Sequence, residues 1–234
     1  DEGAPGGSKL IAFDCATGRQ LWERSKPTHG SWATPIIIEA AGKTQIITLA
    51  LPFVMCHALA DGNELWRADL MEGEVTPSPI FAGGFVIVVS PAGKLIALRP
   101  DGAGDVTKSH VAWTADDNIP DITSPVSNGE LVFTVTTGGG LAAFDIKEGK
   151  KVWEKDLEVE VQSSPAIAAN QLLVLSTKGD LLSLAAGREF KELGRTKLDD
   201  SFHASPAFAG GRMFLRGATN LWCLGIPKEV ASAR

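Results

Sequence analysis

The chain has 234 residues and lacks several features that would assign it to a functional class. Its three cysteines are an odd number without paired spacing, so no disulfide framework or cysteine metal site is expected, and the redox compartment stays open. No apolar run approaches the ~18 residues that cross a bilayer, which predicts no membrane span. Lysine and arginine do not cluster and the formal net charge is −6. Nucleic acid is therefore not an expected partner.

The sequence also lacks the common catalytic and metal-binding motifs. The glycines of "TTGGGLAAF" (136–144) precede a strand and not a helix, so we interpret them as a hairpin turn and not as a phosphate loop. The insertion "DGAGDVTKSH" (101–110) allows a loose calcium site, but a solvated turn is favoured. The four histidines have no metal-ligand spacing, and no nucleophile elbow or pair of catalytic carboxylates is present. We lean toward a protein that is not an enzyme.

What the sequence does contain is a repeat of 40 to 47 residues, marked twice in each period. One marker is a tryptophan that ends phrases such as "LIAFDCATGRQLW" and "LAAFDIKEGKKVW", and the other is a proline in phrases such as "SPIF" and "SPAI". The tryptophans are Trp22, Trp66, Trp113 and Trp153, and the prolines are Pro35, Pro79, Pro125, Pro165 and Pro206. Two independent markers with the same spacing establish a true structural repeat.

Each period has the pattern of four short strands. In residues 164–198, "SPAIA", "LLVLST", "LLSLAA" and "FKELGRTKL" alternate with the turns "AANQ" and "KGD", and no segment has a helical period. Four antiparallel strands every 40 to 45 residues predict an all-β propeller. We expect one domain over 1–234, with about five blades and a flexible tail at 226–234. The expected repeats are 9–26, 31–70, 75–116, 122–157, 162–198 and 202–225.

Aligning the third strands of the repeats separates a small column from a large one. The small column is Ala12, Ala58, Ala97, Ala143, Ser183 and Cys223, and the large column is Phe13, Leu59, Leu98, Phe144, Leu184 and Leu224. Because alternate side chains face the two neighbouring blades, we expect one face to be approached closely and the other to fill a layer. On this alignment Cys56 occupies a leucine position, His57 replaces Ile, Leu or Trp, and Cys56 and Cys223 are core residues. Cys15 lies in a turn and is expected to be exposed.

The turn after each third strand is predicted to hold the next structural motif. Asp14 and Thr17 can bond the backbone of a tight turn, and Gly18 supplies a permissive conformation. Trp22 then begins the outer strand, where its ring can cover a turn of the adjacent blade. The docking residues expected in this way are Asp14, Thr17, Gly18, Trp22, Gly62, Trp66, Trp113, Asp145, Gly149 and Trp153.

These phrases resemble the tryptophan-docking repeat of quinoprotein-type propellers, which is roughly Ala-x-Asp-x-x-Thr-Gly-x-x-x-Trp. The first copy matches fully, the copy ending at Trp153 has Glu148 in place of Thr, the copy ending at Trp66 lacks the Asp, and the copy near Leu193 lacks the Trp. The whole chain is similar to pyrroloquinoline-quinone-like repeat proteins of the planctomycete type and to the outer-membrane assembly lipoprotein B propeller. The resemblance implies a periplasmic or cell-surface location.

Quinoprotein dehydrogenases with this repeat hold their quinone beside a vicinal disulfide, with calcium bound by Glu, Asn and Asp. This chain has no Cys-Cys pair, so no cofactor is predicted, although pyrroloquinoline quinone with calcium remains an alternative. The resemblance also implies a ring of seven or eight blades.

The strand count suggests that the chain is part of such a ring. It has two strands (9–23), four whole repeats and three final strands (202–225), which makes 21. The first residues are acidic and glycine-rich and lack the features of a signal peptide. We expect a C-terminal portion of a larger propeller, with exposed blade faces and edges that favour self-association.

Candidate binding residues lie where the first strand of each blade begins, at the mouth of the central channel. We single out Trp32, Glu74, Asp121, Gln162 and His203. The alternative, that these residues simply begin strands, stays open.

The predicted function is a non-catalytic binding or scaffold module for a protein or extended peptide, taken at the channel mouth or by strand addition at an edge. The alternatives are a pyrroloquinoline-quinone-dependent dehydrogenase domain and the sensor portion of a membrane-anchored receptor.

Overall fold

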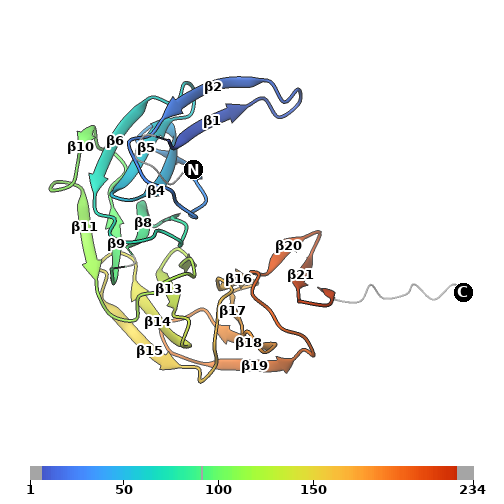
Figure 1. Ribbon diagram of the computed structural model, residues 1–234. Helices are drawn as coiled ribbons and strands as arrows, with labels where there is room; N and C mark the ends of the chain where they lie inside the picture. The colour runs from blue at the N-terminus through green and yellow to red at the C-terminus, as the bar shows by residue number, and fades with distance from the viewer. Residues whose placement is uncertain (1–6, 91, 226–234) are drawn as a thin grey trace, which may run out of the picture.

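The computed structural model describes residues 7–90 and 92–225, and within them it contains β-strands and no helices. Six sheets follow one another along an open arc (Figure 1). The predicted all-β propeller of four-stranded antiparallel blades is thereby confirmed. The predicted tail at 226–234 lies outside the described residues. No helix in the described part of the chain is long and apolar enough to cross a membrane.

The first half of the arc contains three sheets. The first sheet has β1 (Lys9–Phe13) and β2 (Gln20–Ser25). The second has β3 (Ile36–Ala40), β4 (Lys43–Ala50), β5 (Phe53–Ala58), β6 (Glu64–Asp69) and, added in parallel to β6, β10 (Gly104–Asp105). The third has β7 (Ile80–Ala82), β8 (Phe85–Ser90), β9 (Lys94–Leu98) and β11 (Val111–Ala115).

The second half contains the remaining three sheets. The fourth has β12 (Val126–Ser127), β13 (Leu131–Val135), β14 (Gly140–Asp145) and β15 (Lys151–Asp156). The fifth has β16 (Ala166–Ala168), β17 (Gln171–Leu175), β18 (Asp180–Ala185) and β19 (Glu192–Lys197). The sixth has β20 (Ala207–Ala209), β21 (Arg212–Arg216) and β22 (Leu221–Gly225). In each complete sheet the last strand lies on the outer rim of the arc (Figure 1).

Neighbouring sheets share apolar layers, because alternate side chains of one strand point to opposite faces. In β8, Val86 and Val88 pack with the second sheet, whereas Ile87 and Val89 pack with the fourth. The same division occurs in the fourth sheet, where Phe133 faces the fifth sheet. Each central sheet thus buries both faces only because it has a neighbour on each side.

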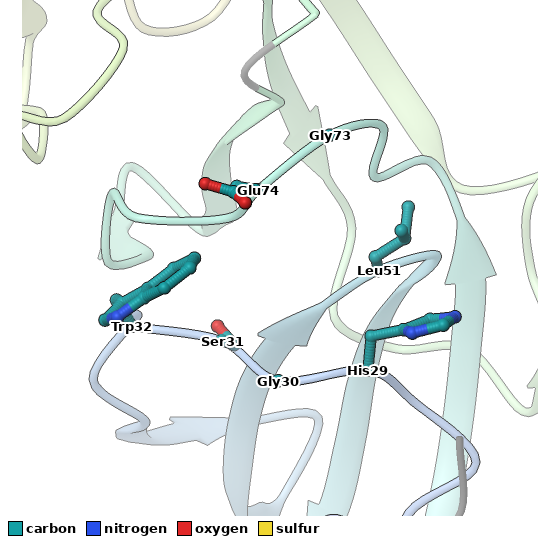
Figure 2. A pocket seen from close by; sticks show the side chains of 7 residues that line it. All are labelled: His29, Gly30, Ser31, Trp32, Leu51, Gly73 and Glu74. Carbon is teal, nitrogen blue, oxygen red and sulfur yellow. The ribbon is translucent and has the colours of Figure 1, made fainter. Parts of the chain in front are cut away.

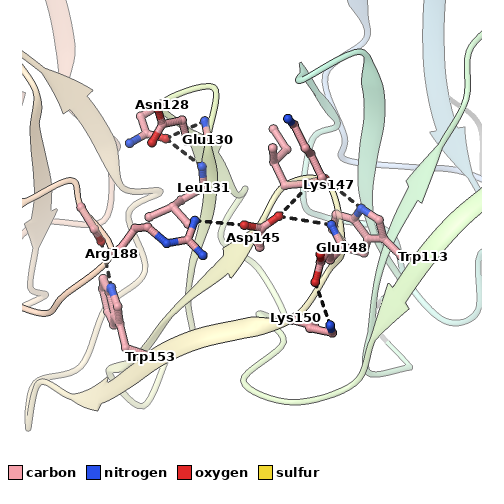
Figure 3. A network of polar contacts seen from close by, with 12 residues as sticks. Trp113, Asn128, Glu130, Leu131, Asp145, Lys147, Glu148, Lys150, Trp153 and Arg188 are labelled. Atoms are coloured by element: carbon pink, nitrogen blue, oxygen red, sulfur yellow. Dashed lines mark hydrogen bonds and ion pairs between the residues drawn. The ribbon is translucent and has the colours of Figure 1, made fainter.

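Tryptophans of the outer strands dock on the next sheet. The indole N–H of Trp22 donates to the carbonyl of Leu59 at 3.1 Å, and Trp66 donates to Pro100 at 3.2 Å. Two further copies, drawn in Figure 3, follow the same rule. In them Trp113 donates to the carbonyl of Ile146 and Trp153 to that of Gly187, both at 2.9 Å. In the fifth sheet Gly194, opposite Ser183, stands where the other sheets have tryptophan.

Carboxylates and glycines shape the turns on which these rings dock. Asp14 accepts bonds from the backbone N–H and the hydroxyl of Thr17, at 2.8 and 2.6 Å. Asp145 accepts from the backbone N–H of Lys147 and pairs with Arg188 of the next sheet (Figure 3). Gly149 has a positive φ, and its α-carbon lies directly against the Trp113 ring. Gly62 lies in the same way against Trp22.

A second link runs along the inner side of the arc, at the Ser/Thr residue before each marker proline. The backbone N–H of each such residue donates to the hydroxyl of its counterpart in the next sheet. The pairs are Thr34 to Ser78 at 2.9 Å, Ser78 to Ser124 at 3.0 Å, Ser124 to Ser164 at 3.0 Å and Ser164 to Ser205 at 2.9 Å. We call this series the serine belt. It fixes the spacing of the first strands and so of the loops that precede them.

The structure corrects the predicted register of the second repeat. Cys56 pairs with Trp66, just as Ala12 pairs with Trp22, so Cys56 and not Ala58 belongs to the small column. His57, and not Leu59, therefore occupies the large column. Its side chain is buried, with Nδ1 3.2 Å from the Gly62 carbonyl oxygen. The error arose because Ala58-Leu59 is also a small residue followed by a large one, and it lies two residues after the true pair, Cys56-His57.

Two other expectations are wrong. Cys223 is exposed and not a core residue, because no described sheet covers that face of β22. The insertion 101–110 is more than a solvated turn. Its residues Gly104–Asp105 form β10, a twenty-second strand that pairs with Trp66 and Arg67, and Val106 is buried beside it.

The two ends of the arc leave apolar side chains uncovered within the described residues. Ile11, Phe13 and Leu21 are exposed on the first sheet, and Phe208 and Leu221 on the last. Self-association through these ends stays a prediction.

The glycine beneath a docked ring gives the first testable prediction. A Cβ at Gly149 would lie 2.5 Å from the Trp113 ring. We expect Gly149→Ala to lower the free energy of unfolding by about 2–4 kcal/mol, through strain at positive φ and overpacking. Gly18→Ala is the matched control, because its φ is also +69° and its Cβ would meet nothing within 4 Å. The control should lose about 1 kcal/mol in the same urea titration. Equal losses would contradict the docking role of the ring.

Candidate functional site

A pocket of about 630 Å³ opens between the loop from β2 to β3 and the loop from β6 to β7 (Figure 2), at the end of the strands where the sequence predicts a channel mouth. The turn between β4 and β5 closes one side. The lining residues are His29, Gly30, Ser31, Trp32, Leu51, Gly73 and Glu74. The volume lies within the range of sites that hold a side chain or a small ligand.

Backbone bonds hold the walls of this pocket in place. The N–H of Trp32 donates to the carbonyl of Val75 at 3.0 Å, and the hydroxyl of Ser31 donates to the same oxygen at 3.3 Å. On the other side the N–H of His29 donates to the carbonyl of Leu51 at 3.1 Å. These bonds fix the main chain of the loops, so their position does not depend on the side chains of Trp32 and Glu74.

Two side chains give the pocket its chemistry. Trp32 is 65% exposed, although a large aromatic side chain is usually buried in a folded domain. Glu74 makes no hydrogen bond or ion pair with another residue in the described part of the chain. Figure 2 shows the Trp32 ring and the Glu74 carboxylate on the same side of the opening, with His29 and Leu51 across from them. An exposed aromatic face beside an unpaired carboxylate can offer a ligand both an apolar contact and a charged hydrogen bond.

The five predicted mouth residues do not form one site. Trp32 and Glu74 line the pocket together; that they bind a partner stays a prediction. Asp121 instead accepts a bond from the Thr137 hydroxyl at 3.2 Å, and Gln162 and His203 are exposed on later loops. They lie outside the lining of this pocket.

Sequence reasoning missed five members of the pocket: His29, Gly30, Ser31, Leu51 and Gly73. His29 was considered only as a metal ligand, and Leu51 belongs to a turn with no repeat marker. Ser31 lies one residue before Trp32 and could have been found from that position alone. Loop residues of this kind are brought together by bonds between loops, which leave no periodic pattern in the sequence.

The residues present do not fit a quinone held beside a vicinal disulfide. Cys15 and Cys223 are exposed and Cys56 is buried, and no two cysteines are adjacent. Burial raises the pKa of the Cys56 thiol to about 12, and this thiol donates to Gln45 at 3.0 Å. In the described segments no three His, Cys, Asp or Glu residues are arranged to hold a metal ion. That the chain carries no cofactor stays a prediction.

The His57 ring is the other notable buried titratable group. Burial lowers its pKa, against a raising contribution from its bond to the Gly62 carbonyl. Its Nε2 atom and the hydroxyl of Thr28 have no hydrogen-bond partner among the described residues. His57 is therefore a neutral core residue, and it does not line the pocket.

Comparisons with known proteins agree with this architecture. A family model described as "Outer membrane protein assembly factor BamB" matches residues 6–155 and 105–189. The factor of that name from Alteromonas naphthalenivorans is 26% identical over 159 residues, which cover 63% of this chain and 36% of that protein. The one from Vibrio cholerae serotype O1 is 29% identical over 131 residues, which cover 49% and 32%. This chain thus spans about a third of the length of the curated relatives it matches.

Solved structures show the same fold. The crystal structure of BamB from Moraxella catarrhalis aligns with a TM-score of 0.71 at 13% identity, over 95% of this chain and 65% of that chain. The C-terminal WD40 domain of Sif2 aligns with a TM-score of 0.67 at 11% identity, over 93% and 64%. At these identities the likeness establishes the propeller fold alone.

The exposure of Trp32 can be tested by fluorescence. Of the six tryptophans, Trp32 is the most exposed. We expect Trp32→Phe to remove the component most readily quenched by acrylamide and to change the free energy of unfolding by less than about 0.5 kcal/mol. Trp153→Phe is the control. It should keep that component and lose about 1–3 kcal/mol, because it gives up buried ring area and the bond to Gly187. Unchanged quenching in Trp32→Phe would contradict the open site.

Proposed function

This chain belongs to the family of the outer membrane protein assembly factor BamB, and we propose that it is a non-catalytic scaffold that binds a protein partner at the channel mouth. The observation that carries the proposal is the pocket in which Trp32 stands open beside Glu74. Interfaces between proteins are centred on such aromatic anchors, and tryptophan is among the residues that contribute most to binding.

The shape of the mouth supports an extended protein segment over a small metabolite. The pocket opens onto a row of loops, one per sheet, held at a fixed spacing by the serine belt. The residue three before each marker proline is Trp32, Thr76, Ile122, Gln162 or His203. A segment running along this row would meet a different side chain at each step. Repeat proteins bind extended partners on surfaces of this kind.

The relatives are named for the assembly of outer membrane proteins. We extend that role to this chain as part of the proposal, with a location in the periplasm or at the cell surface. The dehydrogenase alternative has no favouring observation among the described residues.

Photo-crosslinking tests the proposal. Trp32→p-benzoylphenylalanine places a reactive ketone at the mouth, and Lys150→p-benzoylphenylalanine, in a turn at the other end of the strands, is the control. The Lys150 side chain is 78% exposed. In cells of the source organism expressing the full-length protein, we expect discrete adducts with proteins from position 32 and not from position 150. Identification by mass spectrometry should then show components or clients of outer membrane protein assembly.

The same experiment can refute the proposal. If position 32 yields no protein adduct beyond those of position 150, the mouth does not hold a protein partner. If the adducts are proteins unrelated to outer membrane assembly, the scaffold function stands and the assembly role fails.

A further inference from the structure

The two ends of the strands differ sharply in charge. The mouth end is formed by the loops that lead from each outer strand to the next first strand, at 26–35, 70–79, 116–125, 157–165 and 198–206. These loops contain nine carboxylates: Glu72, Glu74, Asp116, Asp117, Asp121, Glu158, Glu160, Asp199 and Asp200. Their one lysine, Lys26, is buried. The turns between second and third strands lie at the same end and add one lysine, Lys178.

The opposite end is balanced. It is formed by the turns between third and fourth strands, at 14–19, 59–63, 99–110, 146–150 and 186–191, and by the short turns between first and second strands, at 41–42, 83–84, 128–130, 169–170 and 210–211. Seven carboxylates there face seven lysines and arginines. The nine carboxylates and two lysines of the mouth end leave an excess of seven negative charges there, whereas the formal net charge of the whole chain is −6. Because like charges repel, a net negative charge concentrated at one end does not stabilise the fold.

The carboxylates of the mouth end are not neutralised by their surroundings. In the described part of the chain Asp117 alone of the nine makes an ion pair, with Lys151. Desolvation raises the pKa of Asp200, but hydrogen bonds from Ser201, Thr219 and Asn220 outweigh it and hold the pKa below its usual value. Asp200 is thus charged at neutral pH, and it still contributes to the field.

The pocket adds a specific contact to this field. A guanidinium or ammonium group placed between Trp32 and Glu74 would lie on an aromatic face and beside a carboxylate that has no other partner. Cations are attracted by the π-face of tryptophan, and arginine also stacks on it as a flat group. A charge-assisted bond to Glu74 would fix the direction of the side chain. An acidic or phosphorylated segment would be repelled by the same surface.

We propose that the mouth end binds a basic, extended protein segment, with one arginine or lysine side chain in the pocket between Trp32 and Glu74. The inference rests on the proposed function and adds the chemistry of the partner. The field draws the segment along the loops, and the pocket selects one residue of it. Association should accordingly weaken as salt screens the carboxylates.

Labelled peptides test the inference by fluorescence anisotropy with the full-length protein. The probes are three twelve-residue peptides of Gly, Ser and Ala that carry Arg, Gln or Glu at every third position. We expect the Arg peptide to bind at least about tenfold more tightly than the Gln peptide, and the Glu peptide not to bind. Glu74→Gln and Trp32→Ala should each weaken binding of the Arg peptide by about 5- to 10-fold, since each removes about 1 kcal/mol of contact.

Glu148→Gln is the matched control, because it removes one exposed carboxylate at the opposite end. It should change the affinity by less than about twofold. Unfolding midpoints of all variants would show that the fold is intact, as expected for exposed positions. A competition arm adds free argininamide, which should displace the peptide only at concentrations far above the peptide's own dissociation constant.

Each other outcome overturns a defined part of the inference. Equal affinity for the Arg and Gln peptides, together with protein adducts at position 32, would leave the scaffold function standing and remove the preference for a basic partner. Argininamide as effective as the peptide would show a site for a small cation and not for a protein segment. An equal effect of Glu74→Gln and Glu148→Gln would show general attraction with no role for the pocket.

Discussion

The interface between consecutive sheets is the contact on which the whole arc depends. A sheet such as β7, β8, β9 and β11 has two apolar faces, and it can bury both only between two neighbours. Burial of this kind is worth roughly 25 cal/mol per Å² of apolar surface, so a sheet with an open face loses much of its stabilisation. Tryptophan docking joins the first five sheets at the outer rim, and the serine belt joins the second to the sixth at the inner side. From the second sheet to the fifth, three independent contacts at three radii hold each pair of neighbouring sheets in one register.

That regularity explains what could be predicted from the sequence. The fold, the strand order and the docking turns follow from markers that recur because every interface has the same geometry. Features that occur once could not be found in this way. Gly104–Asp105 forms a strand because it lies beside the free edge of β6. Cys223 is exposed because no described sheet covers its face of β22. In the candidate site, Trp32 was found from its distance to a proline and Glu74 from its place near such a position, whereas His29 and Leu51 are joined by a bond between two loops.

The same geometry separates structural residues from binding residues at the mouth. Loop backbones bond to one another, as Trp32 does to Val75, so the position of each loop does not depend on its side chain. The side chain at the position three before the proline can then vary without loss of stability. It is aromatic at Trp32 and a small hydroxyl at Thr76. Loops with a fixed backbone and different side chains can contact different residues of a bound segment, which is suited to recognising its sequence.

The distribution of carboxylates also separates residues that stabilise the fold from residues that are available to a partner. Carboxylates crowded at one end of the strands raise the electrostatic energy of the folded chain. Asp117 and Asp200 also bond to the next sheet, but no such contact accounts for Glu74 in the described residues. Asp145 shows the contrast at the opposite end, where a carboxylate caps a turn and pairs with Arg188, so its charge is satisfied within the fold. Glu74 has no such partner in the described residues, although Lys94 and Lys178 are both available to the chain at the same end. An unpaired carboxylate beside an exposed indole ring does not stabilise the fold. A bound cation would contact both groups, through a charge-assisted bond to the carboxylate and a cation–π contact with the ring.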